Sequence, residues 1–496
     1  MNTKLFKNPE IRRNLWLDFS LQRIVAMPLV IGLILFIAYW NGKDSSEYNP
    51  ETQSFDIVNK GFDYIFLGAV LLFFAIVVAW GSKNASDGIV DEYNNRTWDW
   101  QRSHNLSPWE MTLGKLLGTT LYNWYGGAIC LGIMLFSWPF LTGNQTELVF
   151  TLLTLVITAI ACHSLSLILA LLAIRKSEGR GKVRNGLYIL VVLYGFSSII
   201  SPFITGFQKS LLSNQDVLIP QINWFGISIS LGLYQFISIC FFASWALFAL
   251  YRNFRTEYQY LNDSFAWIGF LAYLIINQIS SNAELIILSE KMNFGFTTSL
   301  FISLLYLIYI LGFLSYGVIL LEPKNFIAWK KFYQALQERD WKGINHHFPL
   351  WLLTFLTFCL IVLATIVLWM VGDVVDIGKI SFLSSAIKEF GFSDLFIPGI
   401  LLALPLFMAR DFSILLYLHA APRHKRALGA TILYLVVLYL ILPLLLFTVD
   451  AKSLIFLFLP FGSFASFSWL SALLQLGLIL FFLYAKFNKR LQVEAE

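Results

Sequence analysis

Long apolar runs separated by short polar segments dominate the pattern along the chain. A helix needs about 20 mostly apolar residues to cross the hydrocarbon core of a bilayer, and the chain offers many such runs. The pattern therefore predicts an all-α polytopic membrane protein with about twelve transmembrane helices. The predicted spans are 24–41, 61–81, 119–141, 148–173, 186–206, 225–251, 265–288, 299–320, 350–371, 393–408, 428–449 and 469–485.

The composition supports a membrane protein. The 496 residues are 57% hydrophobic and only 13% charged, and a soluble protein would carry about twice that charge. A transmembrane β-barrel would show short alternating segments instead of long continuous runs. The first apolar run, 24–40, lacks a small-residue cleavage pattern, so we interpret it as a first transmembrane helix and not as a signal peptide.

The basic residues are distributed unevenly between alternate connecting segments. With the N-terminus inside, 28 of the 35 Lys and Arg fall in the terminal and connecting segments on the inner side. This bias predicts that both termini are cytoplasmic. It also accounts for the net charge of +5, which therefore does not indicate nucleic-acid binding.

Two predicted segments are irregular. The span 393–408 is short and contains Pro398 and Pro405. The apolar stretch 453–465 is interrupted by Pro460 and Gly462. Such a stretch favours a re-entrant or interfacial segment on the outer side.

The segment 82–118 is predicted to be cytoplasmic and to contain a short helix. Ser107 can cap this helix, Pro108 suits its first position, and Glu110 stands three residues after the cap, as a capping box requires. The helix is predicted to lead through Met111 and Leu117 into the third span.

Exposed Trp and Arg are favoured at protein contacts, and this segment contains Arg96, Trp98, Trp100, Arg102 and Trp109. A partner-binding surface is one interpretation. The alternative is a membrane-interface belt, with Trp at headgroup level and no partner.

This segment resembles the first cytoplasmic loop of ABC-2 type transporter permeases. The matching positions are Glu92, Thr97, Leu106, Ser107, Pro108, Glu110, Gly114, Lys115 and Leu116. The resemblance implies a type V exporter-like architecture in which the short helix is a coupling helix that docks in a groove of a separate ATPase subunit. It implies ATPase-coupling roles for Glu92, Arg96, Thr97, Ser107, Pro108, Trp109, Glu110 and Lys115.

The first 23 residues are also consistent with this resemblance. Apolar Ile11, Leu15 and Leu17 alternate with Arg12 and Asp18. Such a segment can lie in the membrane interface as an amphipathic helix, and the family has an elbow helix at this place. The alternative is a frayed basic tail.

The same layout recurs in the second half of the chain. A basic, aromatic segment at 325–351 precedes span 9, and the predicted cytoplasmic loop 409–427 places Pro422 and Arg423 as further ATPase-coupling candidates. This layout predicts an elbow segment at 1–23, a first permease unit at 24–257, an insertion at 258–323 and a second, shortened unit at 324–496. A six-plus-six duplication fits worse, because the second amphipathic segment precedes span 9 and not span 7.

The chain has no recognisable nucleotide site. A P-loop needs Gly, four residues and then Gly-Lys-Ser/Thr, but Gly181-Lys182 has Lys176 at the first Gly position and Val183 at the Ser/Thr position. We therefore expect no catalysis and no cofactor in this chain. The resemblance implies that ATP is bound by a partner ATPase, itself a homodimer. The four cysteines fall within apolar runs and predict neither disulfides nor a metal site.

Ionisable residues at membrane depth are functional candidates by default, and the sequence offers His163 and Glu284. These two residues are the basis of the alternative function, a proton-coupled secondary transporter with twelve spans. For His163 by itself, a neutral ring bonded to a neighbouring helix is favoured. A membrane enzyme acting on lipid-linked substrates ranks third, because the largest outer loops, 42–60 and 372–392, lack His and Arg.

The resemblance also implies an exporter in the bacterial inner membrane. It is compatible with a homodimer or a further membrane subunit beside the ATPase.

Overall fold

The computed structural model describes residues 8–49, 54–103, 106–141, 145–177, 182–183, 186, 188–195, 221–225, 227–280, 296–322, 326–371, 397–419, 427–460 and 464–493. The chain divides into two compact units. The first is Met1–Ile222 with Gly226–Asn262, and the second is Asn223–Phe225 with Asp263–Glu496.

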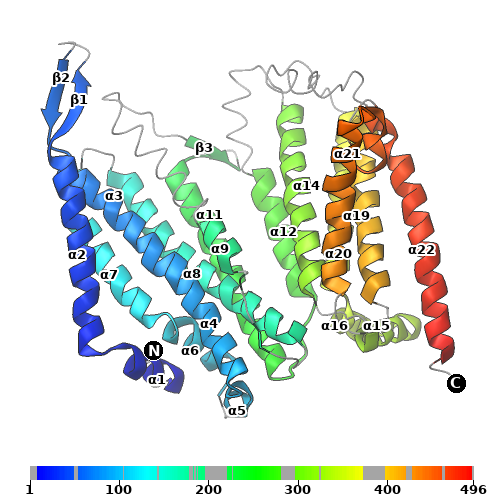
Figure 1. Cartoon of the computed structure of the whole chain (residues 1–496), viewed down its shortest axis with the longest axis horizontal. Helices are drawn as coiled ribbons and strands as arrows, with labels where there is room; N and C mark the ends of the chain where they lie inside the picture. The colour runs from blue at the N-terminus through cyan, green and yellow to red at the C-terminus, as the bar shows by residue number, and fades with distance from the viewer. Residues whose placement is uncertain are drawn as a thin grey trace. The chain divides into compact units, whose positions relative to one another are not determined.

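The first unit is helical, with an antiparallel hairpin after its first long helix (Figure 1). The hairpin pairs Ser45 with Val58 and Asn49 with Ser54. The elements are α1 (Pro9–Asp18), α2 (Leu21–Lys43), β1 (Ser45–Asn49), β2 (Ser54–Val58), α3 (Gly61–Phe73), the π-helix η1 (Phe74–Trp80), α4 (Gly81–Asn94), α5 (Trp98–Arg102), α6 (Pro108–Gly118), α7 (Leu121–Ser137), η2 (Trp138–Phe140), α8 (Gln145–Ser177), α9 (Tyr188–Gly195) and α11 (Leu231–Glu257). Strands β3 (Gln221–Trp224) and β4 (Ile227–Ser230) precede α11.

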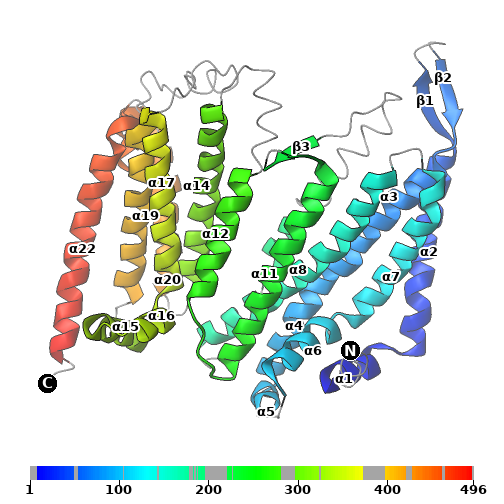
Figure 2. The same ribbon diagram turned by 180° about the vertical axis from the view of Figure 1, so that it is seen from behind.

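The second unit is also helical (Figure 2). Its elements are α12 (Phe265–Ser280), α14 (Phe296–Leu321), α15 (Phe326–Glu338), α16 (Trp341–His347), α17 (Leu350–Val371), α19 (Ile397–His419), α20 (Ala427–Val436), the π-helix η6 (Val437–Ile441), α21 (Leu442–Thr448), the 3-10 segments η7 (Lys452–Leu457) and η8 (Ala465–Phe467), and α22 (Ser468–Val493). Helices α12 and α14, which the sequence assigned to an insertion, lie within this unit.

Nine helices in the described part of the chain are long and apolar enough to cross a membrane. They correspond to predicted spans 1, 2, 4, 6 and 8–12. The third, fifth and seventh predicted spans contain the shorter helices α7, α9 and α12. The polytopic all-α class is thus confirmed, and twelve spans remain a prediction.

Helix α19 differs from its prediction. The span was expected to end at residue 408, followed by a cytoplasmic loop from 409. The helix instead continues to His419, and Arg410 and Asp411 are buried within it. The sequence interpretation failed because two adjacent charges indicated a loop, whereas opposite charges can neutralise each other inside a packed helix bundle.

Helix α2 shows how the first unit forms its core. Met27, Ile31 and Leu35 recur every four residues and are buried, because this spacing places them on one face of the helix. They pack with Phe66 and Phe73 of α3 in one cluster. Apolar residues on the other faces of α2 are exposed, as expected of a helix that faces lipid.

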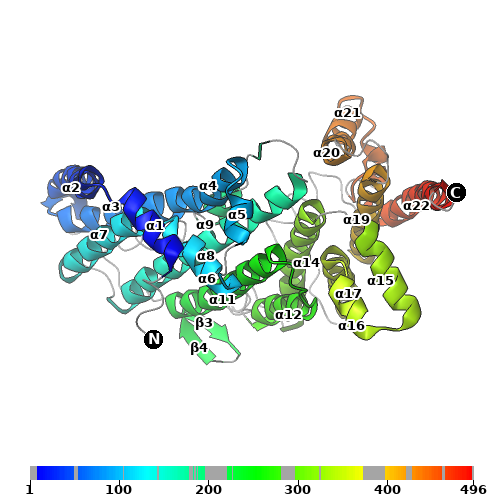
Figure 3. The ribbon, with the colours of Figure 1, turned by 90° about the horizontal axis from the view of Figure 1, so that it is seen from below.

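Short helices lie at one end of each unit (Figure 3). In the first unit these are α1, α5 and α6, at the end where α4 terminates. In the second unit they are α15 and α16, where Trp329 of α15 contacts Trp351 of α17 with ring centroids 5.8 Å apart. Helices form within both predicted amphipathic segments, α1 in the first and α15 with α16 in the second. The position of these helices in a membrane interface remains a prediction.

Candidate functional site

The N-terminus of α6 has the predicted capping box. The Ser107 Oγ accepts a hydrogen bond from the Glu110 amide at 3.2 Å, and the Ser107 amide donates to Glu110 Oε2 at 3.0 Å. Two backbone N–H groups that the helix itself leaves unpaired are thereby satisfied. Pro108 occupies the first turn, where its missing N–H is tolerated.

The end of α4 is closed by Thr97. Its amide and its Oγ1 both donate to the carbonyl oxygen of Glu92, at 2.9 and 3.1 Å. Arg96 stands in the turn with a left-handed φ of 60°, and its side chain is exposed. This tight closure fixes the position of Glu92 at the end of a helix that begins in the membrane-spanning region.

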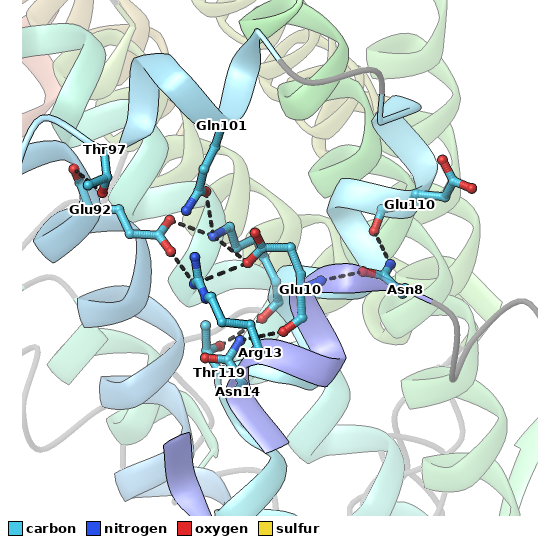
Figure 4. Close-up of polar contacts among 10 residues, drawn as sticks. Asn8, Glu10, Arg13, Asn14, Glu92, Thr97, Gln101, Glu110 and Thr119 are labelled. Atoms are coloured by element: carbon cyan, nitrogen blue, oxygen red, sulfur yellow. Dashed lines mark hydrogen bonds and ion pairs between the residues drawn. The ribbon is translucent and has the colours of Figure 1, made fainter. Parts of the chain in front are cut away.

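A charge cluster, consisting of Glu10, Arg13, Glu92, Gln101 and Lys115, lies where four helices meet (Figure 4). Lys115 on α6 is fully buried, and its Nζ donates to Glu10 Oε2 at 2.9 Å, to Glu92 Oε2 at 2.5 Å and to Gln101 Oε1 at 2.8 Å. An ammonium group has three N–H donors, so each donor has one acceptor, and each acceptor comes from a different helix.

Arg13 completes the charge balance of the cluster. Its Nη2 lies 2.5 Å from Glu92 Oε1 and 3.2 Å from Glu10 Oε2. Two cations thus face two carboxylates. Burial acts to lower the pKa of Arg13, but the hydrogen bond to Glu92 and the charges of Glu10 and Glu92 outweigh it and raise that pKa above its ordinary value. Arg13 is therefore a permanent cation in the cluster.

Helix α1 packs closely on α6 because α6 carries glycines at the contact. A Cβ at Gly114 would stand 2.8 Å from Glu10 Cβ, and one at Gly118 would stand 2.7 Å from Asn14 Nδ2. Asn8 caps α1 and also donates from its Nδ2 to the carbonyl oxygen of Glu110 at 2.7 Å. The two helices are thus joined by polar contacts at both ends of their interface.

The three Trp of this segment have different environments. Trp98 is buried, and its ring lies 5.9 Å from Lys115 Nζ. Trp109 is 44% exposed and packs edge-on against Tyr251 of α11. Trp100 is 66% exposed. One Trp therefore belongs to the core, and two present aromatic surface beside the charge cluster.

A second ionic group links α5 to the helices behind it. Glu257, near the end of α11, pairs with Arg102 of α5 at 3.5 Å and with Arg175 of α8 at 2.6 Å. Arg102 also pairs with Asp99 within α5. Helices α1, α4, α5, α6, α8 and α11 are therefore connected by charged contacts at this end of the unit.

The structure brings together most of the residues predicted from the sequence. Glu92, Thr97, Ser107, Glu110 and Lys115 lie within one contiguous set of contacts. The sequence interpretation missed Asn8, Glu10, Arg13 and Gln101. A local signal for the first two was present, because Asn8-Pro9-Glu10 is a helix start of the same kind as Ser107-Pro108.

The intramembrane candidates have different outcomes. His163 is buried, and its Nε2 contacts the carbonyl oxygen of Val77 at 2.8 Å. The carbonyl can only accept, so Nε2 carries the hydrogen. Glu284, Pro422 and Arg423 lie outside the described residues.

A buried polar network in the second unit was also missed. Asp411 Oδ2 accepts from Tyr316 Oη and from Tyr439 Oη, both at 2.6 Å. Arg410 donates to Asp411 Oδ1 at 2.9 Å and to Gln475 Oε1 at 2.6 Å. Charged side chains within a span are expensive and usually paired. The adjacent opposite charges in a long apolar stretch were the available signal.

The fold and this site define a multi-pass membrane protein whose first unit carries a capped, charge-anchored helix at one end. Residues 43–214 match the family model described as ABC-2 family transporter protein, which covers about a third of the chain. This match confirms the predicted resemblance to ABC-2 type permeases for the part of the chain that carries the capped helix. No curated protein and no solved structure matches it.

Proposed function

We propose that this chain is the transmembrane subunit of an ATP-driven exporter and that α5 and α6 receive the movement of a separate ATPase. The observation that carries the proposal is the burial of Lys115, whose three donors join α6 to α1, α4 and α5. A force applied to α6 is therefore passed to three helices together.

The connections beyond the cluster lead into the spans. Helix α6 continues after two residues into α7, α1 precedes α2, and α4 is continuous with η1 and α3. A switching mechanism requires that a ligand-bound partner contact two states of the permease differently. The joined helices would respond as one body to such a contact.

The docking surface would include Arg96, Trp100 and Trp109. Two of these are aromatic and partly or largely exposed, and one is a cation. Trp and Arg are the residue types that contribute most at protein interfaces. The proposal includes ATP on the partner, a dimeric ATPase, an inner bacterial membrane and cytoplasmic termini, as the family resemblance and the basic residues imply.

The test is purification of the tagged chain in mild detergent from its native host, followed by assay of co-purifying ATPase. We expect the Trp100→Ala/Trp109→Ala variant to weaken ATPase binding about tenfold or more, because exposed Trp residues are frequent hot spots. Trp40→Ala is the matched control, since Trp40 is 63% exposed near the far end of α2.

Equal retention of the ATPase by the double variant and the control would contradict this docking surface. Purification without any ATPase would contradict the ATP-driven function as a whole. In that case transport in sealed vesicles driven by a proton gradient would support the alternative, a proton-coupled transporter.

A further inference from the structure

The long helix that ends at the charge cluster contains a π-turn. Elements α3, η1 and α4 form one continuous helix over Gly61–Asn94, which at 1.5 Å per residue is about 51 Å long. The hydrocarbon core is about 30 Å thick, so this helix is longer than one crossing needs, and Glu92 lies near its C-terminal end. Residues Phe74–Trp80 adopt the π form. This form is rare in proteins as a whole, but where it occurs it is often found at functional sites.

Two side chains from two other helices bind consecutive carbonyls of this π-turn. Asn123 of α7 donates from Nδ2 to Ile76 O at 2.8 Å, and His163 of α8 donates from Nε2 to Val77 O at 2.8 Å. Asn123 also accepts, through its Oδ1, from Asn84 Nδ2 at 2.9 Å. The turn is therefore held from both sides and from the α4 segment below it.

Glycines allow the close approach that these bonds need. A Cβ at Gly81 would overlap the His163 ring, and a Cβ at Gly127 would stand 2.5 Å from Val77 Cγ2. Small residues at helix contacts are a general means of close packing in membranes. The glycines therefore allow α7 and α8 to pack closely against the long helix at the π-turn.

The surroundings of the second ring nitrogen of His163 favour a role in anchoring the π-turn over a role in proton transfer. His163 Nδ1 is buried and has no hydrogen-bond partner in the part of the chain that the structure describes. The ring packs edge-on against Trp124, with centroids 5.7 Å apart. A proton relay requires a partner on each side of the ring, whereas anchoring a carbonyl requires only the Nε2 donor.

We infer that His163 and Asn123 are positioning residues that hold the π-turn as a joint, through which displacement of α4 at the charge cluster is passed to α7 and α8. The inference rests on the proposed function, because the displacement is supplied by the ATPase at α5 and α6. The inference predicts that weakening the hydrogen bonds to the π-turn leaves the ATPase bound, because the π-turn is not part of the proposed docking surface.

The experiment is hydrogen–deuterium exchange on the ATPase-bound complex in nanodiscs, with and without adenylyl-imidodiphosphate. In the unaltered complex we expect the nucleotide analogue to change exchange in peptides of both 82–94 and 121–137. In His163→Leu and Asn123→Leu, residues 74–81 should exchange about threefold to tenfold faster, as expected when one carbonyl of the π-turn loses its hydrogen bond, and the change in 121–137 should disappear. Asn123→Leu also removes the acceptor of Asn84 Nδ2.

Two control variants make the result specific. His163→Gln retains an N–H donor and should restore the unaltered behaviour. Ser164→Ala removes a hydroxyl that, among the described residues, bonds within its own helix, to Ile160 O at 2.8 Å, and should behave as the unaltered chain. The inference is overturned if the Leu variants bind the ATPase and still show the change in 121–137, or if Ser164→Ala loses it as well. Absence of any bound ATPase would instead overturn the proposed function, and this inference with it.

Discussion

At the scale of single residues, Lys115 has the largest predicted effect on stability. Replacing it with Met leaves Glu10 and Glu92 facing Arg13 alone. Removing one partner of a buried ion pair typically costs about 3–5 kcal/mol, because the remaining charge is uncompensated. We expect Lys115→Met to lower the free energy of unfolding of the first unit by about this amount, measured by thermal unfolding of the purified chain in detergent.

A matched lysine is available as the control for this prediction. Lys83 lies on α4, is half-exposed and stands 3.8 Å from Asp87. Exposed pairs of this kind contribute about 0–1 kcal/mol, so Lys83→Met should change the unfolding temperature little. Equal losses in both variants would show that the cluster is no more than a surface network.

Arg410 and Asp411 give a second prediction at this scale, in the second unit. Single variants Arg410→Met and Asp411→Asn should each destabilise it, because each leaves a buried charge or donor without its partner. The double variant should lose less than the sum, with a coupling energy of about 1–3 kcal/mol in a double-mutant cycle. Additive losses would mean that the two side chains do not interact in the folded chain.

At the scale of elements, the start of α6 depends on its capping box. Ser107→Ala removes the acceptor of the Glu110 amide, and loss of an N-cap typically costs about 1 kcal/mol. We expect faster amide exchange in the first turn of α6, with Ser107→Asp retaining the protection because aspartate also caps. Unchanged exchange in Ser107→Ala would show that the contact with α1 alone holds this turn.

The same helix shows what the sequence could predict. The capping box was recognised because its partners lie three residues apart, so the local pattern contains the whole interaction. The partner of Lys115 on α1, Glu10, lies 105 residues earlier, and hydrophobic periodicity carries no information on such a contact. The glycines at 114 and 118 were visible, but only the packed helices show that they admit Glu10 and Asn14.

Helix α19 is an element whose end the sequence did not predict. Hydropathy ended this span at residue 408 because it scores each charge separately. In the structure Arg410 pairs with Asp411, and Tyr316, Tyr439 and Gln475 supply the remaining hydrogen bonds. A pair with this many partners can be buried, and its partners come from three other elements. No window along the sequence could have contained them.

At the scale of the whole molecule, the orientation in the membrane is the property that most needs a direct test. Single cysteines can be placed at Asp44, at the end of α2, and at Asp99, on α5, in a background in which the four natural cysteines are replaced. Both positions are exposed. A membrane-impermeant maleimide should label Asp99→Cys only after the cell is opened, and Asp44→Cys in intact spheroplasts. Labelling of both from one side would contradict the orientation inferred from the basic residues.

The long separation between Glu10 and Lys115 also has a consequence for biosynthesis. Helix α1 is made first, but its anchor on α6 exists only after residue 115 has left the ribosome. Within α1 itself Glu10 and Arg13 lie 3.2 Å apart, so they can pair with each other before Lys115 is available. Two spans are inserted in the meantime. The charge cluster can therefore form only after the first two predicted spans have been made, and a chain truncated before Lys115 would leave α1 without its anchor on α6.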